Sequence, residues 1–502
     1  MGGGAGLKRI RFLCVLPALL LLFGCGAERG TSLQQPPAPQ SESSSMREPE
    51  HSPRQLRLAV SEGDVLNPYR LTSQLNADVS ALLYDPFIKL DASFAPRGYL
   101  AQEPLLEGTV CTLRLREGIT FGDGSPLTAQ DAAYSYTLAA ARDAAGRFSN
   151  VESCTAQDES TLVFTLKRPD RYFLNLLTFP IIKSGSGEED TPPGTGRYRM
   201  GGDGRLIQNI GHFEGGSRVE TITLVPVGDA DEIGYDLITD RIDYARRPKG
   251  SAQPEASGSV PVQENTLVYL GFNGSIFPSD NADFRRAVDA MLDRSAIVSQ
   301  SFSGRAAAAQ DPVNPAFYDA RGEPRELPDP DALLDAMGLE ERDAEGYRTR
   351  SGGAVFEVQL AINVESTAKR DAAALLKQQF ASHGLHLTVN EYSFEQFTGQ
   401  IAAGGYNMYL GEVRLPEDMD ISVLLSPEGA LHHHLPDTAE LYQSYLQARE
   451  GLLSMGEFYS RFWQQAPFVP LLYTQSVISH SRNFYPAVVA TDQDIFYNIS
   501  KW

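Results

Sequence analysis

Cysteine is scarce in this sequence, with only Cys14, Cys25, Cys111 and Cys154 among 502 residues. No two of them form a C-x-x-C pair, so zinc-knuckle and thioredoxin-type sites have no support. Cys14 and Cys25 lie close to the N-terminus. Only Cys111 and Cys154 therefore belong to the body of the chain.

Catalytic signatures are also missing. The chain contains no G-x-S-x-G elbow, no H-E-x-x-H pair and no Walker loop. Three of its eight histidines are consecutive, His432–His434, and adjacent residues point in different directions in a helix or strand. In a loop they could hold a soft divalent ion, but solvated loop histidines are the simpler interpretation. We therefore predict no enzyme, no cofactor and no metal site.

Positive charge is in deficit. The chain has 43 Lys and Arg against 64 Asp and Glu, which gives a formal net charge of -21. An acidic surface repels nucleic acid and anionic headgroups, so nucleic acid is not expected as a partner. Such a surface does not repel a cationic ligand, although solubility alone explains the composition.

The apolar run FLCVLPALLLLFG follows the basic start Lys8–Arg11 and is short for a membrane span of about 20 residues. It ends in LFGCG, which resembles the lipobox of bacterial lipoproteins, in which Cys25 becomes a lipidated N-terminus. We predict a signal peptide over 1–24, and a lipidated cysteine with a disordered tether over 25–53, which is rich in Ser, Gln, Pro and Glu. The alternative is an ordinary signal peptide with an incidental cysteine.

The body alternates between strand-like and helical patterns. TVCTLRLREGITF and FEVQLAINV alternate as strands, and DFRRAVDAMLDRSAIVSQSF has the spacing of a helix. STAKRDAAALLKQQFASHG reads as a helix that begins at Ser366 or Thr367 and stops at Gly384, and the strand LHLTVNEY follows it. This β–α–β run predicts a parallel pair with a right-handed crossover. The pattern indicates an α/β protein of about two to four domains.

The stretch ITFGDGSPLTAQDAAYSY combines a turn with a helix start. Thr128 and Asp131 form a capping box, and Gly122–Gly124 forms the turn. A phosphate-binding loop would carry more glycines and a Lys or Arg at the helix start. We therefore interpret the turn as structural.

The longer segment LRLREGITFGDGSPLTAQDAAYSYTLA resembles the signature of the bacterial extracellular solute-binding proteins, family 5, the oligopeptide-, dipeptide- and nickel-binding group of ABC importers. Further segments resemble the family in the same order: PPGTGRYRM, VYLGFN, FRRAVDAMLDRSAIV, LPDPDALLDAMGL with AEGY, QQFASHGLHLTV and QQAPFVPLLY. The resemblance extends from about Arg54 to the C-terminus.

The resemblance implies a two-lobed α/β fold like that of periplasmic binding proteins (type II, with an extra subdomain) and a hinge between the lobes. The implied parts are lobe I over 54–75, 181–270 and 477–502, the extra subdomain over 76–180, and lobe II over 271–476. The resemblance implies that the protein is an extracytoplasmic, lipid-anchored monomer. Its implied function is to capture peptides in the interlobe cleft and deliver them to ABC permease subunits. A lipid-anchored peptide-signal receptor and a binder of nickel or another small solute are the alternatives.

The implied ligand contacts lie mainly in the segment GGYNMYLGEVRLPEDMDISVLL. Asp420, Asp418 and Glu412, in that order, are the candidates for the α-amine of a peptide, and Arg414 is the candidate for a ligand carboxylate. Asn273, at the end of the Phe-Asn strand, is a further candidate contact. The alternative is that these are loop residues facing water.

The resemblance also implies that Cys111 and Cys154 lie in one mixed sheet. An extracellular compartment permits a disulfide between them. The alternative is two separately buried thiols that behave as small apolar residues.

Overall fold

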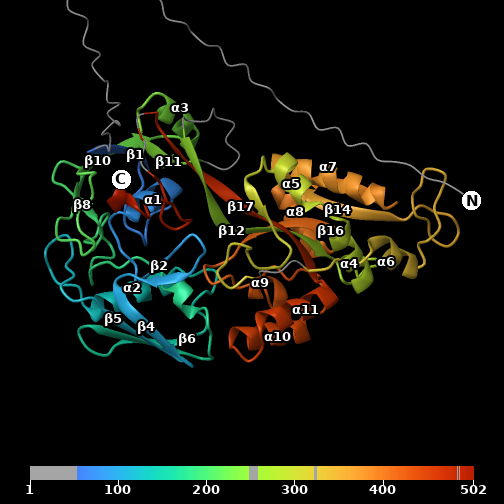
Figure 1. The fold of residues 1–502 in the computed structure, drawn as a ribbon, viewed down its shortest axis with the longest axis horizontal. Helices are drawn as coiled ribbons and strands as arrows, with labels where there is room; N and C mark the ends of the chain where they lie inside the picture. The colour runs from blue at the N-terminus through green and yellow to red at the C-terminus, as the bar shows by residue number, and fades with distance from the viewer. Residues whose placement is uncertain (1–53, 248–257, 321–324, 483, 485–486) are drawn as a thin grey trace, which may run out of the picture. The chain divides into compact units, whose positions relative to one another are not determined.

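The computed structural model describes residues 54–502, except 248–257, 321–324, 483 and 485–486 (Figure 1). The predicted signal peptide, Cys25 and the tether lie outside the described residues. Among the helices of the described residues, none combines the length and the apolar character that crossing a membrane requires.

The described chain is a mixed α/β structure. Its strands are β1 (Gln55–Ser61), β2 (Ile88–Leu90), β3 (Pro96–Gly98), β4 (Ala101–Glu107), β5 (Val110–Leu115), β6 (Val151–Ala156), β7 (Thr161–Leu166), β8 (Tyr198–Met200), β9 (Leu206–Gln208), β10 (Thr221–Val227), β11 (Tyr244–Arg246), β12 (Gly258–Phe272), β13 (Ala306–Ala308), β14 (Glu357–Asn363), β15 (His386–Tyr392), β16 (Met408–Arg414) and β17 (Phe468–His480). Its helices are α1 (Gln74–Ser80), α2 (Ala129–Ala141), α3 (Ile233–Ile238), α4 (Ala282–Met291), α5 (Arg294–Ser301), α6 (Pro330–Ala336), α7 (Thr367–Ser382), α8 (Phe394–Ala403), α9 (Ser422–Leu425), α10 (Ala439–Arg449) and α11 (Met455–Gln465), with 3-10 turns η1 (Phe173–Leu176), η2 (Ala230–Glu232) and η3 (Ile499–Lys501).

One sheet of 11 strands runs through the structure in the order β15-β14-β16-β12-β17-β11-β1-β10-β9-β8, with β13 paired to β17. β1 and β10 are parallel at one end, and β14 and β15 are parallel at the other. The long strands β12 and β17 lie antiparallel between these ends and join them (Figure 1). The predicted lobe limits at 270 and 476 fall inside β12 and β17, so each of these strands runs through a predicted boundary.

The predicted β–α–β unit is present as β14, α7 and β15. The Ser366 side chain caps α7, and the helix ends just before Gly384, whose φ is +76°. The predicted single helix over 283–302 is wrong, because the chain forms α4 and α5 with a break at Leu292. Leu292 has an extended ψ of 119°, and the Asp293 side chain accepts a hydrogen bond from Ala296 N–H and so starts α5.

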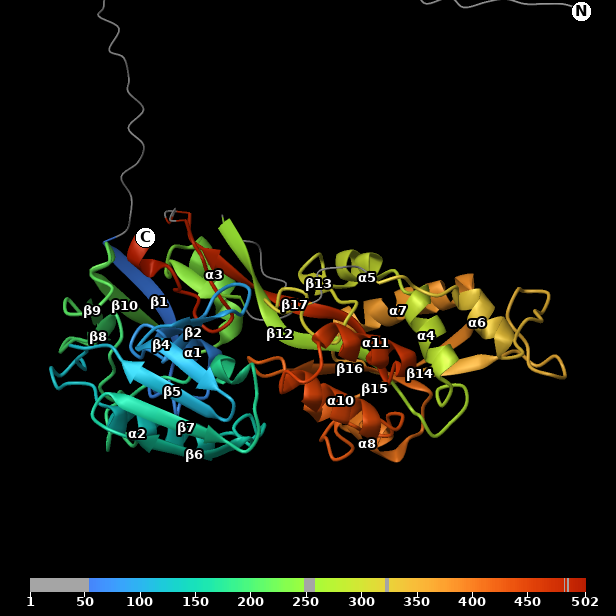
Figure 2. The ribbon, with the colours of Figure 1, turned by 60° about the horizontal axis from the view of Figure 1, so that its bottom comes forward.

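A second sheet of four strands, β4-β5-β7-β6, lies within the predicted extra subdomain, and α2 packs on β6 and β7 (Figure 2). The capping box of Thr128 and Asp131 starts α2 as predicted. Gly124 has a φ of +86°, and Asp123 pairs with Lys183 at 2.6 Å. These contacts support the interpretation of the turn as structural.

The disulfide considered for Cys111 and Cys154 is not formed, because both are free thiols. Cys111 on β5 and Cys154 on β6 both lie opposite Phe164 of β7. The intervening strand separates them by about twice the 4.8 Å strand spacing, whereas a disulfide needs Cα atoms within about 7 Å. Burial raises the pKa of each thiol to about 12.

Candidate ligand-binding hollows

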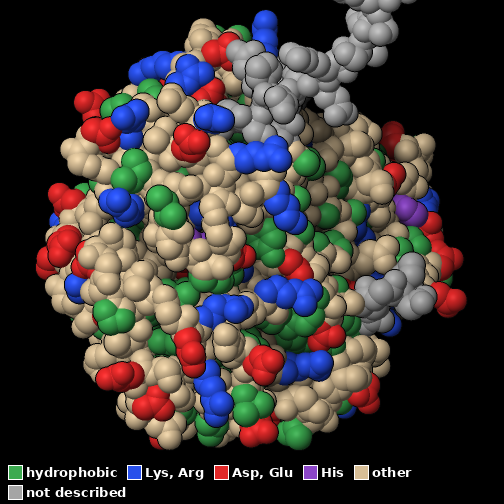
Figure 3. Space-filling view, turned by 60° about the vertical axis from the view of Figure 1, so that its left-hand side comes forward, with side chains coloured by type: hydrophobic (Ala, Val, Ile, Leu, Met, Phe, Trp, Pro, Cys, Tyr) green, Lys and Arg blue, Asp and Glu red, His purple; other side chains and the backbone are tan. Residues whose placement is uncertain are grey.

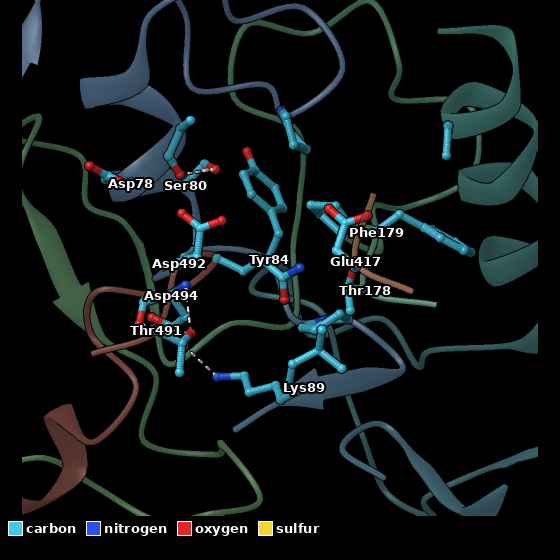
Figure 4. A pocket seen from close by; sticks show the side chains of 18 of the residues that line it. Asp78, Ser80, Tyr84, Lys89, Thr178, Phe179, Glu417, Thr491, Asp492 and Asp494 are labelled. Carbon is cyan, nitrogen blue, oxygen red and sulfur yellow. Dashed lines mark hydrogen bonds and ion pairs between the residues drawn. The ribbon is translucent and has the colours of Figure 1, made fainter. Parts of the chain in front are cut away.

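A hollow of about 360 Å³, called the main hollow here, lies where five parts of the chain meet. Its walls come from residues 68–90 around α1, from the end of α2 and the turn after it, from residues 178–180, from Arg414 and Glu417 at the end of β16, and from residues 491–497 near the C-terminus. Figure 4 labels ten of the side chains that surround this space. A solute placed there touches the segment around α1, the end of α2, the end of β16 and the segment near the C-terminus.

Asp492 connects two arginines in one wall of the main hollow. Arg414 donates to Asp492 Oδ2 at 2.6 Å, and Arg246 Nη1 lies 3.5 Å from Asp492 Oδ1. Arg246 also donates to both carboxylate oxygens of Asp78 at 3.2 Å. Burial raises the pKa of Asp492, although the two guanidinium groups oppose this effect. The wall is therefore a chain of buried ion pairs that ends at Arg414.

Lys89 and Arg147 form two further pairs. Lys89 Nζ lies 2.9 Å from Asp494 Oδ2 and 4.1 Å from the centroid of the Tyr99 ring. Burial opposes the charge on Lys89, but the carboxylates around it outweigh burial and raise its pKa. Arg147 lies 3.4 Å from Glu417. Each ionised wall residue described so far thus has a partner of opposite charge.

Two glycines of the segment PPGTGRYRM make room for the wall. A Cβ atom on Gly194 or Gly196 would overlap the backbone of Leu83. Gly196 N–H donates to Leu83 O at 2.9 Å. Tyr84, the next residue, is 2% exposed and its side chain lines the main hollow. The glycines therefore hold the Leu83–Tyr84 backbone at the position that forms this wall.

A second, more open hollow of about 530 Å³ adjoins the carboxyl end of β14. β14 lies between β15 and β16 and runs parallel to both. The chain adds β15 on one side of β14 and then β16 on the other side, so the strand order reverses at β14. Open α/β sheets commonly bind ligands at such a point. Lys369 and Glu412, 2.9 Å apart, line this second hollow, and Arg414 lines both hollows.

The predicted site residues fall in three places. Arg414 lines both hollows and Glu412 lines the second. Asp418 and Asp420 line neither, and instead join a buried cluster around Arg449. Asn273 also lines neither, because its side chain donates to Gly404 O at 2.8 Å and accepts from Ser275 N–H at 3.0 Å. It therefore orders the turn after β12.

The buried cluster contains three carboxylates around one guanidinium. Arg449 Nη2 donates to Asp418 and, at 2.7 Å, to Asp170 Oδ2, and Arg449 Nη1 lies 3.8 Å from Asp420. The Tyr445 hydroxyl donates to Asp420 at 3.1 Å. Burial raises the pKa of Asp418 to about 7, although the charge of Arg449 lowers it. The neighbouring carboxylates of Asp420 and Asp170 add to the increase. In this arrangement Asp418 and Asp420 hold Arg449 in place by ion pairing.

Two of the consecutive histidines lie within hydrogen-bonding distance of other protein groups. His432 Nε2 lies 2.9 Å from Thr438 Oγ1, and His434 Nε2 lies 3.0 Å from Ala402 O. Burial lowers the pKa of His432 and of His433. Within the described residues, no group of three or more His, Cys, Asp or Glu side chains is arranged to hold a metal ion.

Sequence reasoning missed most of the main hollow. Lys89, Arg147, Asp492 and Asp494 lie far from the segment that the resemblance singled out. Three of them carry a local signal, because Lys89 interrupts the apolar strand-like run PFIKL, and Asp492 and Asp494 form the acidic pair of TDQDIFYN in an aromatic segment near the C-terminus. Charged residues in such surroundings are buried only when they are paired.

Comparisons with known proteins point to one family. Residues 97–418 match the profile of the family described as bacterial extracellular solute-binding proteins, family 5 Middle. The chain is 20% identical to the oligopeptide-binding protein AppA of Bacillus subtilis (strain 168), over 88% of this chain and 90% of AppA. It is 24% identical to the glutathione-binding protein GsiB of Escherichia coli (strain K12), over 83% of this chain and 88% of GsiB.

A solved structure shares the fold. The unliganded open form of MppA, a periplasmic murein tripeptide binding protein, superposes with a TM-score of 0.73 at 15% identity. The match covers 86% of this chain and 94% of MppA. The two-lobed α/β fold is therefore shared over nearly the whole of both chains.

Proposed function

Since this chain belongs to the bacterial extracellular solute-binding proteins, family 5, which are the non-enzymatic substrate-binding proteins of ABC importers, we propose that its solute is a peptide. The peptide binds in the main hollow and is handed to the permease subunits of the importer. Cys25 carries a lipid that holds the protein at the outer face of the cell membrane, and the protein acts as a monomer.

One observation carries the proposal: the main hollow is walled by parts of the chain that lie far apart in sequence and in the sheet. Arg414 is the last residue of β16 and Glu417 follows it, whereas residues 68–90 include α1, which packs on β1 and β11, on the other side of β12 and β17 in the sheet. Residues 491–497 lie near the C-terminus. A solute that contacts both sides stabilises the conformation in which the two sides lie close together, called the associated state. It does so only as far as it binds that conformation more tightly than one in which the sides are apart. This coupling is what a capture-and-deliver protein needs.

The peptide assignment is tested by purifying the protein from its native membranes and identifying the solute that it releases in acid, by mass spectrometry. We expect peptides at close to one per protein. The variant Ala77→Trp fills the main hollow from α1 and should lose them, whereas Ala141→Trp, at the exposed end of α2 outside the hollow, should retain them. Circular dichroism establishes that both variants are folded. Release of a metal ion or a non-peptide solute instead contradicts the peptide assignment.

The anchor is tested separately. Replacement of Cys25 by Ala should abolish lipid labelling and release the protein from membranes or leave its signal uncleaved. Retention of a correctly processed Cys25→Ala protein in the membrane fraction would refute the anchor.

A further inference from the structure

We propose that the main hollow selects acidic peptides, with the spare guanidinium N–H groups of Arg414 as the contact for the anionic group. This inference rests on the proposed function, because it names the charge class of the peptide that the same hollow binds. In this proposal Arg414 contacts an acidic side chain of the peptide, and not only the C-terminal carboxylate that every free peptide has.

In three ion pairs of the wall, the cation is more accessible than its carboxylate partner. The side chain of Arg414 is 55% exposed and that of its partner Asp492 only 4%. Arg147 is likewise more exposed than Glu417, and Lys89 more exposed than Asp494. At these three pairs a solute in the hollow meets the more exposed cation first, whereas at the fourth pair Asp78 lines the hollow and its partner Arg246 does not.

Donors are also left over once the wall is paired. Arg414 uses one nitrogen for Asp492, and within the described residues its other N–H groups have no protein partner. Arg142, which lines the same hollow at the end of α2, is exposed and has no ion-pair partner among the described residues. A guanidinium has five N–H donors in a planar fork that suits a carboxylate, so these two side chains can take an anionic group.

A cationic group finds no equivalent partner in the main hollow. Its four lining carboxylates are each engaged by a cation: Asp78 by Arg246, Glu417 by Arg147, Asp492 by Arg246 and Arg414, and Asp494 by Lys89. Burying an ammonium is costly unless it meets a charge that is free to pair with it. A solute with an added positive charge would first have to break one of these ion pairs.

The selectivity arises in the hollow and not from a broad surface field. On the face shown in Figure 3, the Lys and Arg side chains lie interspersed with Asp and Glu. The chain as a whole carries a formal net charge of -21, which slows the approach of anions. The preference therefore has to show in the contacts made after binding, and removal of Arg414 should remove it.

The test uses three tripeptides with identical free ends, Ala-Glu-Ala, Ala-Gln-Ala and Ala-Lys-Ala, titrated calorimetrically into the full protein after removal of co-purified solute. We expect Ala-Glu-Ala to bind at least 10-fold more tightly than Ala-Gln-Ala, and Ala-Lys-Ala to bind least tightly. Arg414→Gln should cost Ala-Glu-Ala about 10-fold and leave Ala-Gln-Ala within 3-fold. Arg142→Gln should act in the same direction. Arg370→Gln, an exposed position on α7 outside both hollows, is the matched control and should change nothing.

The outcomes separate this inference from the proposed function. Equal or tighter binding of Ala-Lys-Ala overturns the charge class but leaves the protein a peptide binder. An Arg414→Gln variant that weakens all three peptides equally also overturns it, because Arg414 then acts on the hollow as a whole. If none of the three binds, the net charge of the co-purified peptides decides: negative supports the inference, and neutral or positive overturns it. Absence of any peptide by both methods refutes the proposed function itself.

Discussion

At the scale of single residues, the unusual feature is the set of charges around Arg449. One guanidinium faces Asp170, Asp418 and Asp420, and the Tyr445 hydroxyl lies beside them. Two buried carboxylates and a third, partly exposed one cannot all stay ionised beside one cation, so one of them retains its proton at a higher pH than usual. Burial gives this role to Asp418, with a pKa of about 7, whereas the pKa of Asp420 is lowered, because Arg449, Ser422 and Tyr445 together outweigh its burial.

This predicts how the pH dependence of stability changes in Asp418→Asn. The Asp418 pKa is higher in the folded state than the value of about 4 in the unfolded chain, so its contribution to stability falls as pH rises from about 4 to 7. Asparagine stays neutral at every pH. Relative to the wild type, the variant should therefore gain about 1–4 kcal/mol between pH 5 and pH 8. Urea unfolding at the two pH values measures this, and a difference that does not change with pH refutes the assignment.

The sequence could point to Arg414 but not to the role of Asp418 and Asp420. Arg414 follows a strand in a recognisable segment, so its position at a hollow could be inferred from local order. The environment of Asp418 and Asp420 depends on two residues elsewhere in the chain. Arg449 lies on α10, and Asp170 follows β7 of the four-stranded sheet. Arg449 lies 31 residues from Asp418 and 279 residues from Asp170 in the sequence, and pairing over such separations leaves no local pattern. The same holds for Cys111 and Cys154, since only the strand order shows that β7 lies between them.

At the scale of elements, two helix starts were predicted from the side chain that supplies the cap. The Thr128 and Asp131 box and the Ser366 cap are present as the sequence indicated. The break between α4 and α5 was not predicted, because the apolar spacing continues through it. It depends on the Asp293 side chain, which starts α5 with its own cap and so competes with continuation of α4.

The glycine-rich segment makes a second prediction. A Cβ atom on Gly194 would overlap the Leu83 carbonyl and crowd Tyr84, so Gly194→Ala should destabilise the protein by about 1–3 kcal/mol. Gly202→Ala is the control, because a Cβ atom there meets nothing within 4 Å. Chemical denaturation compares the two variants. Equal stability would mean that Gly194 does not hold the Leu83–Tyr84 backbone in place.

At the scale of the whole molecule, several contacts join the subdomain to the elements around α10. Arg449 pairs with Asp170 at 2.7 Å, Arg147 with Glu417 at 3.4 Å, and Arg171 with Asp319 at 3.2 Å. The Tyr172 ring lies against Phe317 at 5.4 Å between centroids. If the solute favours the associated arrangement, these contacts contribute to its affinity without touching it.

Asp170→Asn tests this coupling, because Asp170 lines neither hollow. Removal of its charge should weaken every peptide by a similar factor of about 3–10, since the associated state becomes less populated. This pattern differs from that of Arg414→Gln, which should discriminate by charge. Titration of the same three tripeptides measures both variants in parallel. Unchanged affinity in a folded Asp170→Asn variant shows that the contact is not coupled to solute binding.

The central claim, that a peptide binds in the main hollow between parts joined by β12 and β17, is tested most directly by a crystal structure of the protein with its co-purified peptide. We expect density for the peptide in contact with Arg414 on one side and with residues 78–89 and 491–497 on the other. Peptide bound elsewhere, such as beside Asp418, or against only one of these walls, would contradict it.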